Sequence, residues 1–340
     1  MKGNFKVSLP FLLTKVEDKV VDYSDIGLWE QIRRNKLAYR YILPAAIVMA
    51  IVTAYPIIYQ VWMAFTNFTV VNLKNPHPAF VGLKNFIDIL KNNVPLENFN
   101  FWRTLTFDVI WTFVNVFFHV TIGISLAVAL NTPRFAAKRF YRSLLIIPWA
   151  VPAYITALIW RDMFDTQFGA VNLLLAKLGL PHNIAWLTNP NPPIHFLSIL
   201  PYSFYACLIT NVWLGFPFMM VVASGALQSV PKELYEAARI DGATERQQFF
   251  EITLPLIRFA MTPAIMLGLI WTFNQFNVIY LVSGGGPLGE TEILVTQAYK
   301  LVNPAGLFGV ASAFGLIVFV ILLFITLVTN RVSKATESVI

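Results

Sequence analysis

Apolar residues fill six stretches of the chain, and polar loops separate them. A helix needs about 20 consecutive apolar residues to cross the hydrocarbon core of a bilayer. Helices are favoured there because a lipid-facing backbone must satisfy its own hydrogen bonds. The pattern therefore predicts an all-α polytopic membrane protein with six transmembrane helices, at about 41–65, 107–130, 143–163, 201–227, 259–282 and 308–330.

The composition of the chain indicates that lipid is the solvent for much of its surface. Of 340 residues, 57% are apolar and 13% are charged, whereas soluble domains have about 45–50% apolar and about 25% charged residues. The net charge of +7 comes from basic residues that cluster at the ends of the apolar stretches. This placement indicates membrane topology, with the lipid bilayer and not nucleic acid as partner. A single cysteine and four scattered histidines exclude an intrachain disulfide and indicate no metal site.

Basic residues also predict which side of the membrane each loop faces. The loop 131–142 has four Lys and Arg residues and no acidic residue, and the N-terminal segment 1–40 ends in a basic cluster. Lys and Arg are enriched in cytoplasmic loops. We therefore expect a multi-pass protein of the cell membrane with both termini, including the tail 331–340, in the cytoplasm. The loop 228–258 is expected on the same side.

The loop 228–258 concentrates charge in a chain that is otherwise poor in it. Its central part reads ELYEAARIDGATERQQFFEITLP, from Glu233 to Pro255. Ser229 suits an N-cap, Pro231 suits a first helical turn, and Gly242 suits the left-handed residue that follows a helix. These signals predict a first short helix that ends in a sharp turn.

A second helix is predicted after this turn. Thr244 and Gln247 have the spacing of a capping box, and the helix is expected to run through QQFFEITL and to stop near Pro255. The residues alone support two interpretations equally. The loop is either an ordinary solvated connection or an amphipathic hairpin that contacts another protein.

Three of the six stretches have faces that combine aromatic, small and neutral polar residues at helical spacing. Sugars bind to aromatic faces and to neutral hydrogen-bonding groups. The same residue types also pack helix against helix, and this is the favoured interpretation of each face taken by itself. The three faces are Trp149, Ala153, Thr156 and Trp160; Asn211, Leu214, Gly215 and Phe218; and Gly268, Trp271, Thr272 and Gln275.

The hairpin contains a motif with two fixed spacings. Glu236-Ala237-Ala238 is followed after three residues by Gly242, and after nine more by Ile252-x-Leu254-Pro255. This pattern resembles the cytoplasmic EAA signature of ABC-importer permeases. Longer stretches, such as IPWAVPAYITALIWRDMF and NQFNVIYLVSGGGP, resemble the MalF-type permease subunits of maltose and maltodextrin importers, over roughly residues 40–330. The resemblance implies the type I ABC-importer permease fold.

The resemblance implies that this chain is a transporter subunit and not an enzyme. The implied partners are a second, MalG-like permease subunit, two MalK-like ATPase subunits, an extracellular sugar-binding protein and the sugar itself. The sequence has no GxxxxGK[ST] motif, so ATP and Mg²⁺ are expected on the partner ATPase, with no cofactor in this chain. The coupling hairpin, 229–257, is expected to dock on the ATPase through Glu236, Ala237, Ala238, Asp241, Gly242, Ile252, Leu254 and Pro255.

The resemblance also implies positions for the sugar contacts, and these positions fall on the three faces described above. They are Trp149, Ala153, Asn211, Leu214, Gly215, Phe218, Trp271, Thr272 and Gln275. The site keeps an aromatic and neutral character, but it departs from the maltose type in part of its hydrogen-bonding pattern. At Ala153, for example, the maltose type has a hydroxyl group. Maltose, a maltodextrin and a related oligosaccharide are therefore all expected substrates.

Other functions fit parts of the sequence. The nearest alternative is an ABC permease for another neutral solute, such as a polyol or a glycerol derivative. A phosphorylated solute fits less well, because the three faces have no Lys or Arg. An ion-coupled carrier would need paired intramembrane carboxylates, and only Asp108 is available. Asp108 belongs to a polar stripe that we expect to hydrogen-bond to the partner permease, formed by Asp108, Thr112, Asn115 and His119.

Overall fold

The structure is a computed structural model that describes residues 30, 33, 35–74, 77–132, 137–191, 193 and 200–337. Helices joined by loops make up this part of the chain, and none of its residues belongs to a β-strand. The chain divides into two compact units, residues 1–59 and 60–340. Most of the predicted N-terminal segment 1–40 lies outside the described residues.

The first unit contains one long apolar helix. It consists of α2 (Lys36–Met49), a π-helical turn η1 (Ala50–Ala54) and the beginning of α3 (Tyr55–Ala64). The helix from Lys36 to the end of α3 has 29 residues and is apolar enough to cross a membrane. It begins before the predicted boundary at residue 41.

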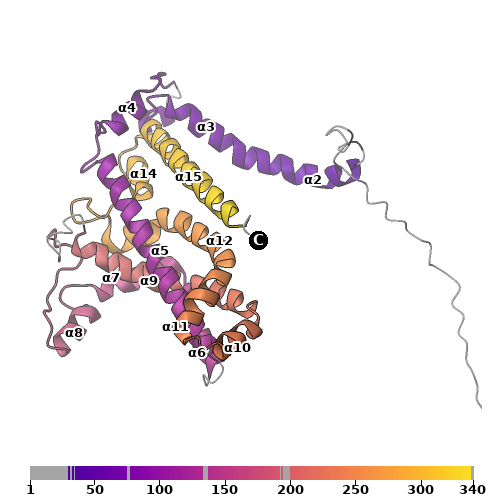
Figure 1. Ribbon diagram of the computed structural model, residues 1–340. Coiled ribbons are helices and arrows are strands. Elements are labelled where there is room, and N and C mark those ends of the chain that lie inside the picture. The colour runs from indigo at the N-terminus through magenta and orange to yellow at the C-terminus, as the bar shows by residue number, and fades with distance from the viewer. Residues whose placement is uncertain are drawn as a thin grey trace, which may run out of the picture. The chain divides into compact units, whose positions relative to one another are not determined.

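The second unit contains the other helices, which are drawn in Figure 1. In chain order they are η2 (Val70–Leu73), α4 (Lys84–Leu90), α5 (Phe101–Asn131), α6 (Lys138–Ala150), α7 (Ala153–Met163), α8 (Ala170–Lys177), α9 (Tyr202–Gln228), α10 (Lys232–Ile240), α11 (Glu245–Gln247), η4 (Gln248–Thr253), α12 (Leu254–Phe273), α13 (Phe276–Val278), η5 (Ile279–Ser283), α14 (Leu294–Val302) and α15 (Phe308–Glu337).

Within the described residues, five helices are long and apolar enough to cross a membrane, and the bent pair α6 and α7 brings the number to six if it is counted as one broken span. The prediction of an all-α polytopic fold is therefore confirmed. The predicted stretch 143–163 is not one straight helix, because α6 and α7 meet at an angle of 92°. At the other end of the chain, α15 continues to Glu337, past the predicted end of the span at residue 330.

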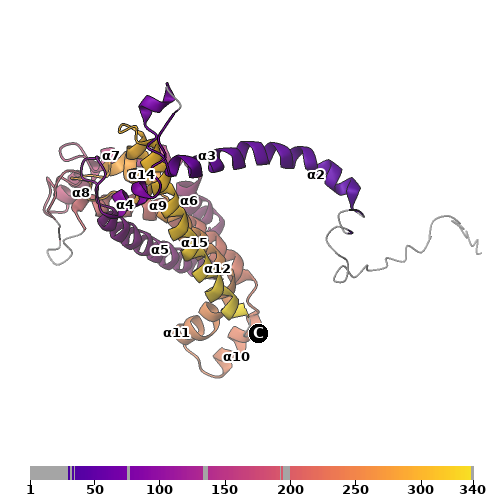
Figure 2. The ribbon, with the colours of Figure 1, turned by 90° about the horizontal axis from the view of Figure 1, so that it is seen from above.

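Helix α5 is the central element of the second unit. Its 31 residues span about 46 Å at a rise of ~1.5 Å per residue. Figures 1 and 2 both show α4 and α14 near its N-terminal end and α10 and α11 near its C-terminal end. Residues of α5 contribute to all three buried apolar clusters of the unit, represented by Leu130, Trp111 and Phe101.

Small residues let α5 approach α9 closely. A side chain built at Gly123 of α5 would lie 2.6 Å from Cβ of Met219 and 2.8 Å from the backbone nitrogen of Met220. Helices in membranes associate through close packing of this kind, since lipid tails are as apolar as their side chains. The α5–α9 pair is therefore a rigid framework for the side chains between its ends.

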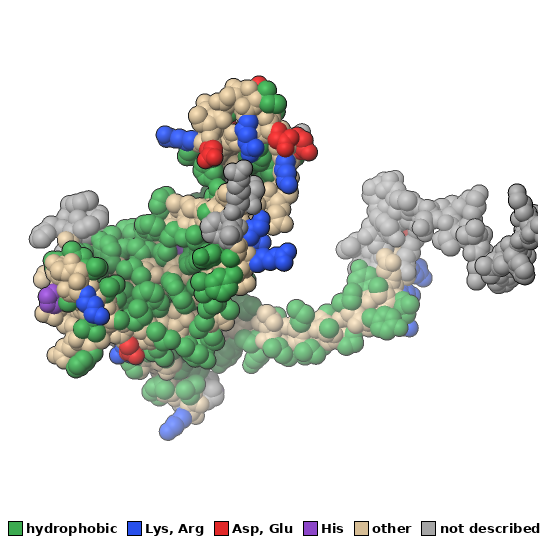
Figure 3. All heavy atoms as spheres, turned by 90° about the horizontal axis from the view of Figure 1, so that it is seen from below, with side chains coloured by type: hydrophobic (Ala, Val, Ile, Leu, Met, Phe, Trp, Pro, Cys, Tyr) green, Lys and Arg blue, Asp and Glu red, His purple; other side chains and the backbone are tan. Residues whose placement is uncertain are grey.

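Apolar and charged side chains occupy different parts of the surface of the second unit. Figure 3 shows hydrophobic side chains over most of the visible face, while Lys, Arg, Asp and Glu gather on a projection formed by the α10–α11 hairpin. An apolar belt with a charged end is typical of a protein that crosses a bilayer and presents one element to water.

Candidate functional site

A cavity of about 380 Å³ lies near the middle of α5, between that helix, the α6–α7 break, α9 and α12. The structure brings all nine predicted sugar-contact residues to its wall, and the wall also includes His119. The nine come from three helical regions that are far apart in the sequence: Trp149, Ala153, Asn211, Leu214, Gly215, Phe218, Trp271, Thr272 and Gln275.

The break between α6 and α7 forms one side of this central cavity. Val151 (ψ 135°) and Pro152 (ψ 128°) have extended backbone, because Pro152 cannot continue the hydrogen-bonding of α6 and disfavours a helical conformation at the residue before it. The chain turns at this point, so that Trp149 and Ala153 on either side of the break both face the cavity.

The break also corrects the predicted face of this span. Thr156 and Trp160 were expected to share a side with Trp149, but they lie on α7 and do not line the cavity. Thr156 is buried, and the Trp160 ring packs against Trp213 with ring centroids 6.1 Å apart. Helical spacing does not continue across a 92° bend, which is why the prediction was wrong for these two residues.

Three aromatic rings stand together on the cavity wall. The centroid of the Phe218 ring lies 6.0 Å from that of Trp149 and 5.4 Å from that of Trp271. Both tryptophans are about half exposed, at 52% and 53%, so their faces are open to an occupant. An aromatic face of this size offers apolar contact area to the C–H face of a flat ring.

Uncharged amides form a chain behind the rings. The Gln275 amide donates to Oδ1 of Asn211 (3.1 Å), and the Asn211 amide donates to Oδ1 of Asn115 (2.8 Å). The Asn115 amide donates in turn to the backbone oxygen of Trp111 (2.7 Å). Since each donor has an assigned acceptor, the orientation of every amide in the chain is fixed.

His119 closes the site on the α5 side. Its Nε2 donates to the backbone oxygen of Asn211 at 2.9 Å, and the ring is 5% exposed. Gly215 provides the room, because a Cβ at that position would lie 2.3 Å from Nε2 and Cε1 of His119. A glycine is therefore required at position 215, where α9 passes the His119 ring.

The polar stripe of α5 differs from its prediction. Its four members were expected to bond to a partner permease, but all are buried within this chain. Asn115 and His119 bond to α9, as described above, and Asp108 accepts from the backbone N–H of Leu294 at the start of α14 (3.1 Å). Periodicity identified the polar face but not the helix opposite it, so it did not predict that His119 lines the cavity or that Asn115 bonds to Asn211 behind the wall.

Gln275 reaches the cavity by a different route from the predicted one. It was grouped with Gly268, Trp271 and Thr272 by helical spacing, but α12 ends at Phe273. Gln275 has an irregular backbone (φ −78°, ψ 72°) at the start of the short helix α13. Non-helical backbone at membrane depth is tolerated where it lines a cavity or is covered by protein.

The charged hairpin begins with α10, whose C-terminal turn follows the prediction. Gly242 has φ +81°, its N–H donates to the oxygen of Arg239 (3.1 Å), and the N–H of Ala243 donates to the oxygen of Ala238 (2.8 Å). This pair of bonds is the Schellman motif, which needs a left-handed residue after the helix.

The predicted second helix of the hairpin begins as expected but ends later than predicted. Thr244 and Gln247 form the predicted capping box. The helix does not stop near Pro255; it continues through η4 into α12. The wider π-helical turn of η4 lets the proline ring fit without a clash against the preceding turn.

The start of the hairpin also needs a correction. Ser229 does not cap α10; its hydroxyl donates to the oxygen of Ala226 at 2.8 Å and so closes α9. Pro231, not Ser229, precedes the first residue of α10. Two helices separated by only a few residues compete for the same capping group, and local signals do not decide which of them receives it.

The predicted coupling residues separate into an exposed and an anchored set. The Glu236, Ala237, Asp241 and Gly242 positions are exposed, and Ala238 is half-buried. Ile252 and Leu254 instead pack on the buried cluster that α5, α9 and α12 share. The hydroxyl of Tyr235 lies 2.9 Å from that of Thr253, which ties α10 to the helix that continues into the membrane span.

No group of His, Cys, Asp and Glu side chains in the described ranges could hold a metal ion.

Residues 119–337 match the family described as binding-protein-dependent transport system inner membrane component. The chain belongs to this family.

Individual relatives agree with the family match. The chain is 36% identical to the galactooligosaccharides transport system permease protein GanP of Bacillus subtilis (strain 168), over 87% of this chain and 70% of that protein. It is 32% identical to the trehalose/maltose transport system permease protein MalF of Thermococcus litoralis, over 89% of this chain and 95% of that protein.

A solved structure shows the same fold. A bacterial alginate ABC transporter, in complex with an alginate pentasaccharide-bound periplasmic protein, has a chain that matches with a TM-score of 0.72 at 24% identity, over 91% of this chain and 97% of that one. The family match and the relatives show that this chain is a permease subunit of an ABC importer, an inner-membrane component and not itself an enzyme. Such a permease works with a binding protein, a partner permease and an ATPase.

Proposed function

We propose that this permease subunit carries a neutral oligosaccharide of the maltodextrin class and that the central cavity is its binding site. One observation carries the proposal: three aromatic rings and two uncharged amides, those of Asn211 and Gln275, share the wall of one cavity. Aromatic faces take the apolar faces of sugar rings, and amides take the hydroxyl groups. The volume of about 380 Å³ lies in the range of ~300–1,000 Å³ that is usual for small-molecule sites.

The charge of the wall selects against other solutes. None of the described residues that line the cavity is Lys, Arg, Asp or Glu. A phosphate or carboxylate group would enter without an ion partner, and burying an unpaired charge is costly. A small acyclic polyol would leave much of the aromatic surface formed by Trp149, Phe218 and Trp271 uncovered. A neutral ring-shaped sugar fits both properties.

The names of the relatives support a sugar as the solute. They refer to galactooligosaccharides, maltodextrin, and trehalose and maltose. These relatives differ among themselves in sugar and linkage, and Ala153 brings no hydroxyl group to this wall. The substrate we propose is therefore a maltodextrin or an oligosaccharide closely related to it.

We propose further that the exposed face of α10 docks on an ATPase subunit. Two MalK-like ATPase subunits would supply ATP and Mg²⁺, and a MalG-like permease would complete the pathway. The exposure of the predicted coupling residues supports this docking. Glu236 and Asp241 are exposed, whereas Ile252 and Leu254 are packed on the core. A push on α10 would reach the second helix of the hairpin through the Tyr235–Thr253 contact, and that helix continues through η4 into α12. ATP drives transport if its binding favours one orientation of the permease over the other.

The proposed orientation has the hairpin and both termini in the cytoplasm. The basic residues of the loop 131–142 and the position of the hairpin at the C-terminal end of α5 support it. The opposite end of α5, with α4 and α14, then faces outward and is available to a sugar-binding protein.

The proposal is tested by reconstituting the chain in proteoliposomes with its partner permease, its ATPase subunits and its binding protein. We expect ATP-dependent uptake of radiolabelled maltotriose, and no uptake of glycerol 3-phosphate or sorbitol. The Trp271→Ala variant should raise KM for maltotriose ~5–30-fold, which corresponds to a loss of about 1–2 kcal/mol of contact energy.

A matched control is Phe319→Ala, which removes an exposed ring of α15 outside the cavity. Its KM is expected to stay at the wild-type value. Saturable uptake of an anionic solute, or no response of the ATPase activity to any sugar-loaded binding protein, would contradict the proposal.

A further inference from the structure

A second cavity, of about 520 Å³, lies near the N-terminal end of α5. Its wall comes from the loop before α5, from η5, from the glycine-rich loop 284–289 and from α14. His119 of the central cavity is about 27 Å further along α5 than Phe101, at ~1.5 Å per residue. The second cavity is thus a separate space, at the end of the unit opposite the hairpin.

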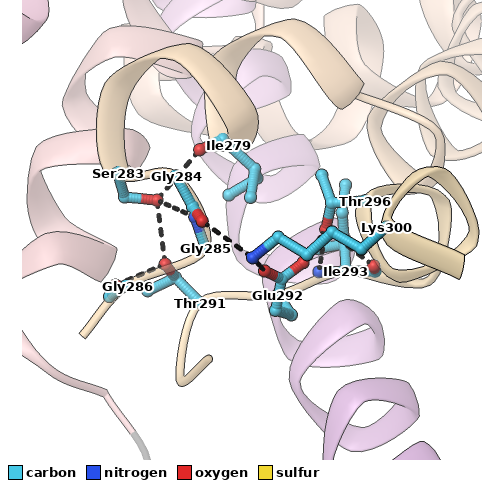
Figure 4. A network of polar contacts seen from close by, with 10 residues as sticks. All are labelled: Ile279, Ser283, Gly284, Gly285, Gly286, Thr291, Glu292, Ile293, Thr296 and Lys300. Carbon is cyan, nitrogen blue, oxygen red and sulfur yellow. Dashed lines mark hydrogen bonds and ion pairs between the residues drawn. The ribbon is translucent and has the colours of Figure 1, made fainter. Parts of the chain in front are cut away.

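A polar network holds this part of the wall in place (Figure 4). Glu292 is 3% exposed; it accepts from the Thr296 hydroxyl and pairs with the Lys300 ammonium group. Lys300 also donates to the backbone oxygen of Gly284 (3.1 Å). The hydroxyls of Ser283 and Thr291 lie 2.9 Å apart on the other side of the loop. A wall fixed in this way loses little entropy when a ligand binds.

The glycine-rich loop depends on glycine at one position in particular. Gly285 has φ +79°, and a Cβ there would lie 1.9 Å from Oε1 of Glu292. Both the left-handed backbone and the lack of space exclude a side chain. The close approach lets the buried carboxylate of Glu292 stand directly behind the loop, where it forms part of the cavity wall.

An unpaired side-chain oxygen of Gln297 favours ligand binding in this cavity. The side chain lines the cavity and is 2% exposed, and its Oε1 has no hydrogen-bond partner among the described residues. Buried side-chain oxygens are nearly always bonded, and leaving one unpaired is unfavourable. A hydroxyl group in the cavity would donate to this oxygen and remove the deficit.

The other lining groups define the chemistry of such a ligand. Glu97 and Glu292 bring two negative charges and Lys300 brings one positive charge, so the wall carries a net charge of 1 − 2 = −1 and disfavours anions. Lys300 is already engaged by Glu292. The ring of Tyr280 lines the cavity and is held by Phe276, with centroids 4.8 Å apart and an interplanar angle of 17°. A neutral ligand with hydroxyl donors and one apolar face fits this set.

We propose that the second cavity is a further carbohydrate site, which holds one sugar ring of the transported oligosaccharide next to Tyr280 and Gln297. This proposal rests on the proposed function, since it takes the same class of ligand. The segment Phe276–Ser283 separates Gln275 of the central cavity from the glycine-rich loop of the second. A sugar held there would stand at the outer end of the path before it enters the central cavity.

Binding stoichiometry tests the proposal in the complete transporter. The complex is placed in nanodiscs without nucleotide, and bound radiolabelled maltotriose is measured by equilibrium dialysis. Gln297→Leu, which keeps the size of the side chain and removes its acceptor, should lower the bound maltotriose at saturation by one molecule per complex. Tyr280→Leu should do the same, which provides a second test if Gln297→Leu does not assemble.

The matched control is Tyr299→Leu. Tyr299 contacts Phe276 and Tyr280, with centroids 5.1 Å and 5.0 Å from theirs, but does not line the cavity. Its stoichiometry should equal that of the wild type. Maltotriose binding that Trp271→Ala lowers and that neither Gln297→Leu nor Tyr280→Leu changes would overturn the second site and leave the proposed function standing. A wild-type complex that binds no maltotriose would overturn both.

Discussion

Replacing Gly215 with alanine tests the packing around the central cavity. The added methyl carbon would lie 2.3 Å from Nε2 and Cε1 of His119 and 2.7 Å from Nδ1. Contacts below about 3 Å do not persist between such atoms, so the imidazole must move. It is 5% exposed and donates to the Asn211 oxygen, and therefore it cannot move without losing this bond or separating α5 from α9.

The structure gives the size of the effect. Overpacking of a well-packed interior costs ~1–3 kcal/mol, and a buried nitrogen without a partner costs ~1–3 kcal/mol. Relaxation avoids part of this sum, and alanine regains ~1 kcal/mol over glycine as a helix former. A net destabilisation of roughly 1–4 kcal/mol remains. Because the methyl group displaces a ring of the cavity wall, the affinity for sugar should fall as well.

The assay is the thermal denaturation of the purified complex, followed by the loss of monodisperse protein in gel filtration. Gly215→Ala should lower the melting temperature by at least a few degrees. The matched control is Gly225→Ala, on the same helix, where a Cβ meets nothing within 4 Å; it should leave the temperature unchanged or raise it. Adding His119→Ala to Gly215→Ala removes the clash, and the two changes should be non-additive. Equal melting temperatures for the two glycine variants would refute this account of the α5–α9 contact.

Two other predictions concern regions outside the cavity. Gly242→Leu places a side chain at φ +81°, which costs ~1–2 kcal/mol and distorts the turn, so ATP hydrolysis should continue with little sugar uptake in proteoliposomes. Asparagine tolerates this backbone conformation, so Gly242→Asn should keep ATP hydrolysis coupled to sugar uptake. Normal sugar uptake by Gly242→Leu would contradict the prediction. In the loop after α7, Asp165 accepts from the N–H groups of Phe168 and Gln167, both at 2.8 Å, and these bonds lower its pKa below the usual 3.8. A lowered pKa stabilises the loop above pH 3.8 and loses this effect as the pH falls through the lowered value. Hydrogen exchange at Gln167 and Phe168, corrected for intrinsic rates, should therefore show protection that decreases on acidification in the wild type but not in Asp165→Asn; a pH-independent wild type would contradict this.

Most of the fold follows from the sequence because its signals are local. Six apolar stretches predict six spans, and the structure has five long helices and one bent pair. Gly242 and the Thr244–Gln247 pair mark the hairpin turn because each satisfies backbone groups within a few residues. The motif spacing is equally local, since it lies within one hairpin.

The remaining features depend on contacts between distant segments. Pro148 and Pro152 mark where the span could break, but they do not specify the 92° bend, and α6 and α7 both contact elements that are distant in the sequence. Asn115 and His119 meet α9 and not another chain, although the sequence shows only that they share a face. Gln275 lies on the cavity wall beyond the end of α12 and not by helical spacing, so the resemblance, and not the helical period, is the sequence signal that groups it with the other lining residues.

Thiol accessibility in the central cavity tests the central claim most directly. The chain has one cysteine, Cys207, which is fully buried, so an introduced cysteine gives the main signal. In the complete transporter, Ala153→Cys is placed on the cavity wall, and Ala170→Cys is placed at the exposed start of α8. We predict that maltotriose slows the reaction of a maleimide with the first variant and not with the second. Equal labelling rates of Ala153→Cys with and without maltotriose, in a complex that takes up the sugar, would contradict the claim that sugar occupies this cavity.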